Sequence, residues 1–150
     1  MIMLIAENKR AYFDYEILET FEAGIVLSGP EVKAVKGGIV NLTGSYVNID
    51  KAGIVWLTNM HIGPYPPAAG VQQNYNPTQP RKLLLRKKEI ASLLGKSRIK
   101  GLTAIPLKVY TKGGLIKIEI GLCRGKKKWD KRETIKKREV ERKIRQELKY

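Results

Sequence analysis

The side chains best suited to acid–base or nucleophilic chemistry, histidine and cysteine, each occur once in this chain, as His61 and Cys123. A histidine that acts as a general base needs a partner to orient it, and only Asn59 lies close to His61 in sequence. A single cysteine excludes an internal disulfide and a zinc site built from several cysteines. The sequence also lacks the GxxxxGK and GxGxxG phosphate-binding motifs. We therefore predict a protein that is not an enzyme and uses no metal or cofactor, with Cys123 in a buried strand.

The chemistry that the residues do favour is the binding of a polyanion. The chain has 29 Lys or Arg against 14 Asp or Glu, a formal net charge of +15. Residues 124–150 alone hold 13 Lys or Arg and 5 Asp or Glu, which gives +8 and leaves +7 for residues 1–123. Such a charge favours binding to phosphate backbones that weakens steeply as salt is added. In this setting His61 is either a structural residue or an RNA contact.

Composition limits how these residues can be organised. A chain of 150 residues with 43% hydrophobic residues can bury one core. Its apolar stretches are too short to span a bilayer, and the apolar residues 1–6 lack the basic start of a secretion signal. We expect a cytoplasmic protein with one domain over residues 1–123. Residues 124–150 form a basic tail that is disordered or helical and folds on binding.

The pattern of residues 1–123 is mainly that of strands. Apolar residues alternate with polar ones at 13–21, with a break near Leu18 that predicts a bulge. Glycines in the turns at 50–53 and 112–114 predict two hairpins. The full set of expected strands is 13–21, 25–27, 45–49, 54–62, 102–110 and 115–122, and the expected helices are 31–36 and 86–94. Gly95 is expected to end the second helix, and the proline-rich residues 63–80 are expected to form a surface loop.

About six antiparallel strands with a few short helices predict a mainly β, α+β fold. We expect a small antiparallel β-barrel of the oligonucleotide-binding (OB) type. That fold agrees with the charge. Glu31 is the carboxylate of interest, because an acid on a phosphate-binding surface needs another role. It either stabilises the N-terminus of its helix, pairs with a neighbouring arginine or accepts hydrogen bonds from a base edge, and its position favours the first.

Short motifs along nearly the whole chain resemble, in order, those of the SsrA-binding protein (small protein B) family. They are GIVL at 24–27, GPEVK at 29–33, NL at 41–42, SYV at 45–47, NMHI at 59–62 with PY at 64–65, RKLLL at 81–85, PL at 106–107 with Tyr110, GKK at 125–127 and DKR at 130–132. The resemblance implies an RNA-binding factor for the tRNA-like domain of transfer-messenger RNA (tmRNA). With elongation factor Tu it would deliver tmRNA to stalled ribosomes for trans-translation, which is ribosome rescue.

The resemblance also implies roles for individual residues. The surface that binds tmRNA would contain Glu31, Val32, Lys33, Asn41, Asn59, His61, Arg81, Lys82, Lys126, Lys127 and Lys128. Arg81 and Lys82 would contact phosphate, while Leu83 and Leu85 would lie in the core. For Tyr46, packing and an RNA contact both remain open.

The tail would fill the decoding centre and the empty mRNA channel of the ribosome, in contact with small-subunit rRNA. Its residues there would be Trp129, Asp130, Lys131, Arg132, Lys136, Lys137, Arg138 and Arg142. Trp129 would stack on a decoding-centre base, a contact that contributes about 1 to 3 kcal/mol.

The chain departs from the family pattern at three places. Tyr75 and Asn76 stand where a His-Asp-Pro sequence followed by Arg is usual, and Lys36 and Gly38 stand where Arg and a basic residue are common. These changes bring single contacts into question. Two other classes remain: a general ribosomal or single-stranded RNA-binding OB-fold protein, and a peripheral membrane protein that uses the basic tail on anionic lipid.

Overall fold

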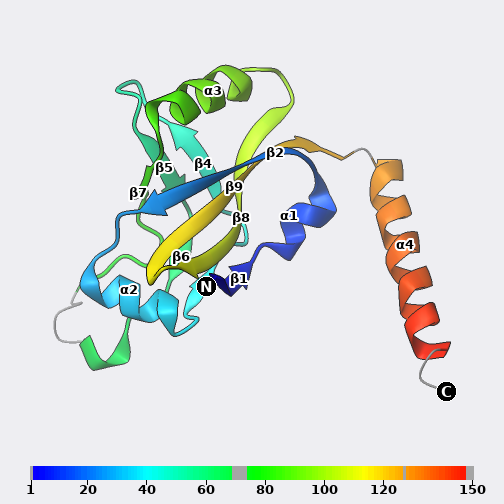
Figure 1. Ribbon diagram of the computed structural model, residues 1–150, viewed down its shortest axis with the longest axis horizontal. Coiled ribbons are helices and arrows are strands. Elements are labelled where there is room, and N and C mark those ends of the chain that lie inside the picture. Colours follow the sequence, from blue (N-terminus) through cyan, green and yellow to red (C-terminus); the bar gives the residue numbers. More distant parts are fainter. Residues whose placement is uncertain (1, 69–73, 127, 148–150) are drawn as a thin grey trace.

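The computed structural model describes residues 2–68, 74–126 and 128–147 (Figure 1), and the side chains of residues 2–67, 74–126 and 135–144. The described elements are β1 (Ile2–Glu7), α1 (Lys9–Asp14), β2 (Tyr15–Ile25), α2 (Gly29–Lys36), β3 (Val40–Asn41), β4 (Tyr46–Ile49), β5 (Val55–Thr58), β6 (His61–Ile62), the 3-10 helix η1 (Pro66–Ala68), β7 (Arg81–Leu84), α3 (Lys87–Ser97), β8 (Leu102–Lys112), β9 (Leu115–Gly125) and α4 (Lys128–Glu147). The predicted mainly β class with short helices is confirmed.

The main sheet is antiparallel and closes on itself. Its seven strands follow the order β1-β8-β4-β5-β7-β2-β9, and β9 also pairs with β8. Six strands therefore form a continuous ring of pairings, with β1 outside it on the edge of β8. The short strands β3 and β6 form a separate two-stranded sheet. This arrangement agrees with the predicted number of strands and with the OB-like class.

The long hairpin of β8 and β9 supplies much of the core. Its turn has Gly113 and Gly114 at φ 58° and 80°, the left-handed region that glycine adopts without strain. Alternate residues of β9, namely Ile118, Ile120 and Leu122, are buried and form its inward face.

Cys123 belongs to a second, smaller cluster with Ala11, Ile105 and Leu107. It is a buried strand residue, as predicted. Burial raises the pKa of its thiol to about 11, so the thiol stays protonated at neutral pH and is a poor nucleophile.

The beginning of the chain differs from the prediction. Phe13 was expected to open a strand, but it belongs to α1, which Asn8 caps by accepting a hydrogen bond from the backbone N–H of Ala11. The strand begins instead at Tyr15, and β1 was not predicted. The predicted bulge near Leu18 is confirmed by a register shift between Ile17 and Glu19. A helix of six residues is too short to produce a clear periodic pattern, and its cap depends on tertiary contacts.

Two other boundaries were wrong. The strand expected at 54–62 is interrupted because Asn59 adopts φ 66°, so β5 ends at Thr58 and β6 pairs with β3. Gly95 does not end α3, which continues to Ser97. The last turn of α3 is held from outside by Lys96, whose Nζ lies 2.5 Å from a carboxylate oxygen of Glu19 in β2.

Gly121 of β9 is a position where the core has no room for a side chain. A Cβ there would lie 2.6 Å from Leu107 Cδ1 and 3.1 Å from Cys123 Sγ. We expect Gly121→Ala to lower the free energy of unfolding by about 1 to 3 kcal/mol, as overpacking of a core does. Urea denaturation measures this change. Gly125→Ala is the control, because no described atom beyond its chain neighbours lies within 4 Å of its Cβ position. Equal losses in both variants would contradict the prediction.

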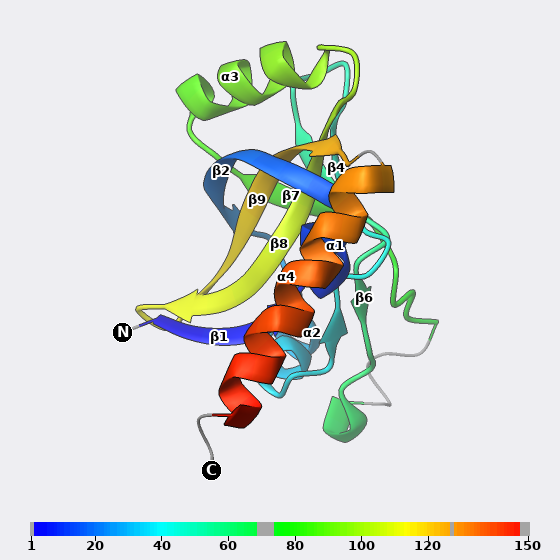
Figure 2. The same cartoon turned by 90° about the vertical axis from the view of Figure 1, so that its right-hand side faces the viewer.

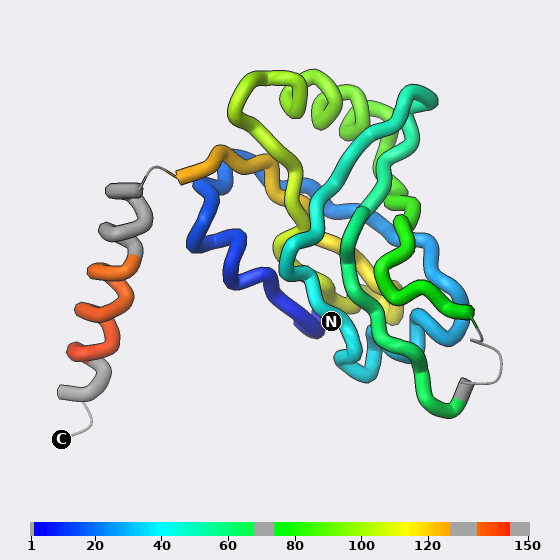
Figure 3. The backbone as a smooth tube through the Cα atoms, turned by 180° about the vertical axis from the view of Figure 1, so that it is seen from behind, coloured from blue at the N-terminus to red at the C-terminus, as the bar shows by residue number. Residues whose placement is uncertain are grey.

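The basic tail leaves the body beside α1. Its predicted first residues, Arg124 and Gly125, are still part of β9. The tail then forms α4, which contacts α1 and otherwise stands apart from the body (Figures 2 and 3). Its apolar side chains Ile135, Val140 and Ile144 are exposed. Among the described residues no helix has both the length and the apolar character to cross a membrane.

Candidate nucleic-acid interface

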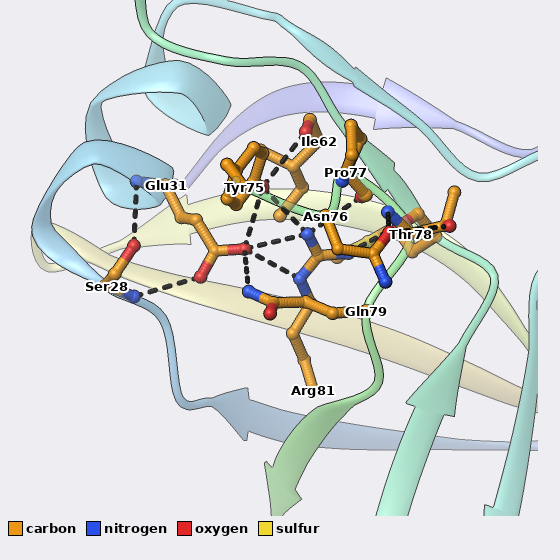
Figure 4. A network of polar contacts seen from close by, with 10 residues as sticks. Ser28, Glu31, Ile62, Tyr75, Asn76, Pro77, Thr78, Gln79 and Arg81 are labelled. Atoms are coloured by element: carbon orange, nitrogen blue, oxygen red, sulfur yellow. Dashed lines mark hydrogen bonds and ion pairs between the residues drawn. The ribbon is translucent and has the colours of Figure 1, made fainter. Parts of the chain in front are cut away.

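A buried ion pair joins Glu31 of α2 to Arg81 of β7 (Figure 4). Both residues are only 3% exposed. One carboxylate oxygen of Glu31, Oε2, lies 2.7 Å from Arg81 Nη2 and accepts a hydrogen bond of 2.9 Å from Arg81 Nε. Arg81 also donates to the Met60 carbonyl, and at 2.9 Å to both the Tyr75 hydroxyl and the Pro77 carbonyl. The guanidinium therefore links α2 to the chain before β6 and to the loop before β7.

The second carboxylate oxygen of Glu31, Oε1, helps to cap the helix to which Glu31 belongs. Ser28 accepts a hydrogen bond of 3.3 Å from the Glu31 backbone N–H, and Glu31 Oε1 accepts one of 3.1 Å from the Ser28 N–H, which completes a capping box. Burial raises the pKa of Glu31, but the Ser28 amide, Arg81 and Tyr75 together outweigh it and lower the pKa. The carboxylate is therefore charged at neutral pH.

Tyr75, in the loop before β7 that departs from the family pattern, belongs to this network. Its hydroxyl lies 2.9 Å from Glu31 Oε2 and 3.0 Å from the Ile62 carbonyl. Burial and the Glu31 carboxylate raise the pKa of Tyr75 to about 12. The hydroxyl therefore stays protonated and serves as a hydrogen-bond donor. Gln79 also reaches Glu31 Oε2, at 3.3 Å. Nothing in the sequence indicated these two contacts, because 44 and 48 residues separate Tyr75 and Gln79 from Glu31.

The geometry corrects the roles expected of Glu31 and Arg81. Both were expected to contact RNA directly, and Arg81 to contact phosphate. The structure places both beneath the surface, with the donors of Arg81 occupied by protein acceptors. Of the roles considered for Glu31 from its position, the helix cap and the arginine pair are both present. The pair therefore shapes the surface above it.

Exposed polar residues lie above this pair, on α2 and the small β3–β6 sheet. Asn41 and His61 face each other across β3 and β6. Lys33 and Lys36 are exposed on α2, and Lys33 Nζ lies 5.8 Å from the centre of the Tyr65 ring. We call these five residues the α2–β6 surface. It brings together three of the predicted RNA contacts: Lys33, Asn41 and His61.

Two other predicted contacts lie on α2 and next to β6, and a third lies apart from this surface, on the main sheet. Val32 is half-buried on α2, and Asn59 is exposed in the turn just before β6. Lys82 is exposed on β7 opposite Trp56 of β5, so it lies on the main sheet. Leu83 is buried as predicted, and Leu85 is partly buried against the core.

The base of the tail is fastened to α1. The Lys126 backbone N–H donates to the Asp14 carbonyl at 2.9 Å, and its side chain donates to the Tyr12 carbonyl at 3.1 Å. Lys127 lies outside the described residues. Lys128, Trp129, Asp130, Lys131 and Arg132 form the first turns of α4, but their side chains lie outside the described residues, so stacking by Trp129 stays a prediction.

Farther along α4 the described cations face solvent. They are Lys136, Lys137, Arg138, Arg142 and Lys143, all exposed, and the first four of them are predicted ribosome contacts. In Figure 1, α2 and α4 lie on opposite sides of the body. The chain thus presents two separate basic surfaces, one on the folded domain and one on the tail.

Comparison with known proteins gives one consistent result. The family model described as SmpB protein matches residues 5–150. The SsrA-binding protein of Carboxydothermus hydrogenoformans is 53% identical over 148 residues, 99% of this chain and 97% of that protein. That of Geobacillus kaustophilus is 49% identical over 141 residues, 94% of this chain and 89% of that protein. A chain from the solved structure "tmRNA-SmpB: a journey to the center of the bacterial ribosome" matches with a TM-score of 0.67 at 49% identity, covering 82% of this chain and 85% of that one. This chain belongs to the SmpB family, the SsrA-binding proteins.

Proposed function

We propose that this protein binds tmRNA and acts with it on the ribosome in trans-translation. The SsrA-binding relatives match almost the full chain, and the similar solved chain comes from a tmRNA-SmpB structure. The observation that carries the proposal is the placement of α2, which bears the exposed Lys33 and Lys36, and of α4 on opposite sides of the body (Figure 1). One basic surface can bind tmRNA while the other binds the RNA of the ribosome.

In finer detail, the α2–β6 surface binds the tRNA-like domain of tmRNA. Helix α4 enters the decoding centre and the empty mRNA channel, and elongation factor Tu takes part in delivery. The protein has no catalytic role and works in the cytoplasm. The exposed cations on α4 support the role of the tail, because a channel lined by rRNA attracts positive charge.

Binding to the tRNA-like domain tests the first half of this proposal. We expect the full chain to bind it tightly at near-physiological salt with excess tRNA present, and a chain ending at Gly125, which lacks Lys126, Lys127 and Lys128 of the predicted contacts, to keep most of that affinity. Lys33→Ala with Lys36→Ala should weaken binding roughly 10-fold, because it removes two exposed cations of the α2–β6 surface. A filter-binding or fluorescence titration measures the dissociation constant.

The matched control is Lys51→Ala, which removes an exposed lysine from the turn between β4 and β5. It should leave the affinity for the tRNA-like domain unchanged. Equal binding of the full chain to every RNA, abolished by ending the chain at Gly125, would instead support the alternative of a general RNA-binding protein.

A further inference from the structure

A cleft of about 320 Å³ lies on the α1 side of the body, between α1, the turn before β4 and the first residues of β8. Its volume is at the lower end of the range of small-ligand pockets, about 300 to 1,000 Å³. Its lining includes side chains from three segments distant in sequence, among them Tyr15, Tyr46 and Thr103. The α2–β6 surface contributes none of these residues.

Two aromatic side chains line this small cleft. Tyr15 packs against the cluster that contains Ala11 and Ile105, so its ring is held in place. Tyr46 stands on β4 and is 43% exposed, with its backbone fixed by pairing to Thr58. Tyrosine rings provide flat apolar faces on which nucleobases of any sequence stack.

The buried polar side chains at the base of the cleft are fixed by hydrogen bonds within the protein. Asn8 is buried, donates to the Pro106 carbonyl at 3.0 Å and accepts from the Ala11 N–H at 3.2 Å. Ser45 is also buried and donates to the Leu42 carbonyl at 2.5 Å. These polar groups are satisfied inside the protein, so they shape the cleft and need no ligand.

The polar groups that remain at the cleft are suited to a base and its phosphate. The hydroxyls of Tyr15, Tyr46 and Thr103 form no hydrogen bond within the part of the chain that the structure describes. Arg10 pairs with Asp14 through Nε at 3.0 Å, and its side chain is 70% exposed. Hydroxyls both donate to and accept from base edges, while a guanidinium binds phosphate.

The cleft also lies at the base of the basic tail. Tyr15 pairs with Gly125 at the end of β9, and the Asp14 carbonyl accepts the Lys126 N–H. An RNA strand drawn to the tail therefore passes close to Tyr15 and Arg10. A cleft elsewhere on the body would lack this source of local RNA concentration.

We infer that this cleft binds one unstacked nucleobase of an RNA partner. The base stacks on Tyr46 against the wall formed by Tyr15, the hydroxyls of Tyr15 and Thr103 contact its edge, and Arg10 contacts the adjoining phosphate. The RNA is either tmRNA or ribosomal RNA, since both present unpaired nucleotides. The inference rests on the proposed RNA-binding function and assigns it a second contact, separate from the α2–β6 surface.

The test compares Tyr46→Ala and Tyr46→Phe with the parent protein in binding to two RNAs, the tRNA-like domain of tmRNA and the small ribosomal subunit. Loss of one stacked base weakens binding roughly 10-fold. We expect Tyr46→Ala to show this loss with one of the two RNAs, which identifies the source of the base, and Tyr46→Phe to bind within about twofold of the parent because it keeps the ring. Thermal unfolding checks that both variants fold.

The control variant is Trp56→Ala, which removes a half-exposed aromatic side chain of the adjacent strand β5 that does not line the cleft. It should bind both RNAs as the parent does. Parent-like binding of Tyr46→Ala to both RNAs, or a loss in Tyr46→Phe as large as in Tyr46→Ala, would overturn the inference. Failure of the parent itself to bind either RNA would instead count against the proposed function.

Discussion

Replacing Arg81 by methionine is expected to lower the free energy of unfolding by about 3 to 5 kcal/mol, the cost of leaving a buried charge without its partner. Arg81 and Glu31 are each 3% exposed, and their charged atoms lie 2.7 Å apart. Without the guanidinium, the carboxylate stays buried with Ser28, Tyr75 and Gln79 as its remaining partners among the described residues. Urea denaturation at pH 7 measures the change.

Two comparisons separate burial of charge from simple loss of a contact. Arg124→Met removes one partner of the exposed Arg124–Glu16 pair, whose side chains are 57% and 55% exposed, and should cost at most about 1 kcal/mol. Arg81→Met combined with Glu31→Gln removes both buried charges and should be more stable than Arg81→Met alone. Equal losses for Arg81→Met and Arg124→Met would contradict the prediction.

The pH dependence gives a second measure of the same pair. The folded state lowers the pKa of Glu31 below its ordinary value of 4.5, so the carboxylate stabilises the protein above that value. This contribution is lost as the pH falls through the lowered pKa. The double variant that combines Glu31→Gln with Arg81→Met has no such carboxylate and should lack that part of the acid dependence.

The ion pair also decides how binding data at Glu31 should be interpreted. Glu31→Ala removes the side-chain half of the capping box, the bond from the Ser28 N–H to the Glu31 carboxylate, and leaves Arg81 buried without its carboxylate. Any loss of RNA binding in that variant would follow from a displaced α2 and a displaced loop before β7. Lys33 is the better test of direct contact, because its side chain is exposed and makes no ion pair with a described residue.

Much of the fold could be predicted because its long strands carry their own signals. The alternation at 115–122 and the glycines at 113 and 114 specify one hairpin without outside help. The short elements could not be predicted in this way. The cap of α1 is held by a bond from Asn8 to the Pro106 carbonyl, 98 residues away, and β3 and β6 are two residues each.

The sequence predicted which residues belong to the site, but it did not predict how they are arranged in three dimensions. Glu31 attracts attention as an acid in a basic chain, and Arg81 as part of a family motif. A motif does not say whether a side chain is exposed, and these two residues are 50 positions apart. Their contact depends on closure of the sheet, which brings β7 beneath α2. Lys33, Asn41 and His61 were selected by the same motifs, and the structure places these three on one surface.

Ending the chain at Gly125 is expected to remove most of the salt-dependent binding to the small ribosomal subunit. The removed residues include 12 Lys or Arg and 5 Asp or Glu, and the described cations on α4 are exposed. If about six of these cations contact phosphate, the affinity of the full chain falls roughly 10³-fold between about 50 and 200 mM salt. The dissociation constant for subunits with an empty mRNA channel, measured across this range, gives the slope for both chains.

A variant that keeps the helix distinguishes charge from loss of the whole segment. Alanine at Lys136, Lys137 and Arg138 preserves helix propensity and should reduce the slope of log affinity against log salt by about 2 to 3, since each phosphate contact contributes about 0.7 to 0.9. This variant should keep the affinity of the parent for the tRNA-like domain, and the truncated chain should keep most of it. An unchanged salt slope after truncation would place the ribosome contact on the folded domain, because the body retains a positive charge of its own.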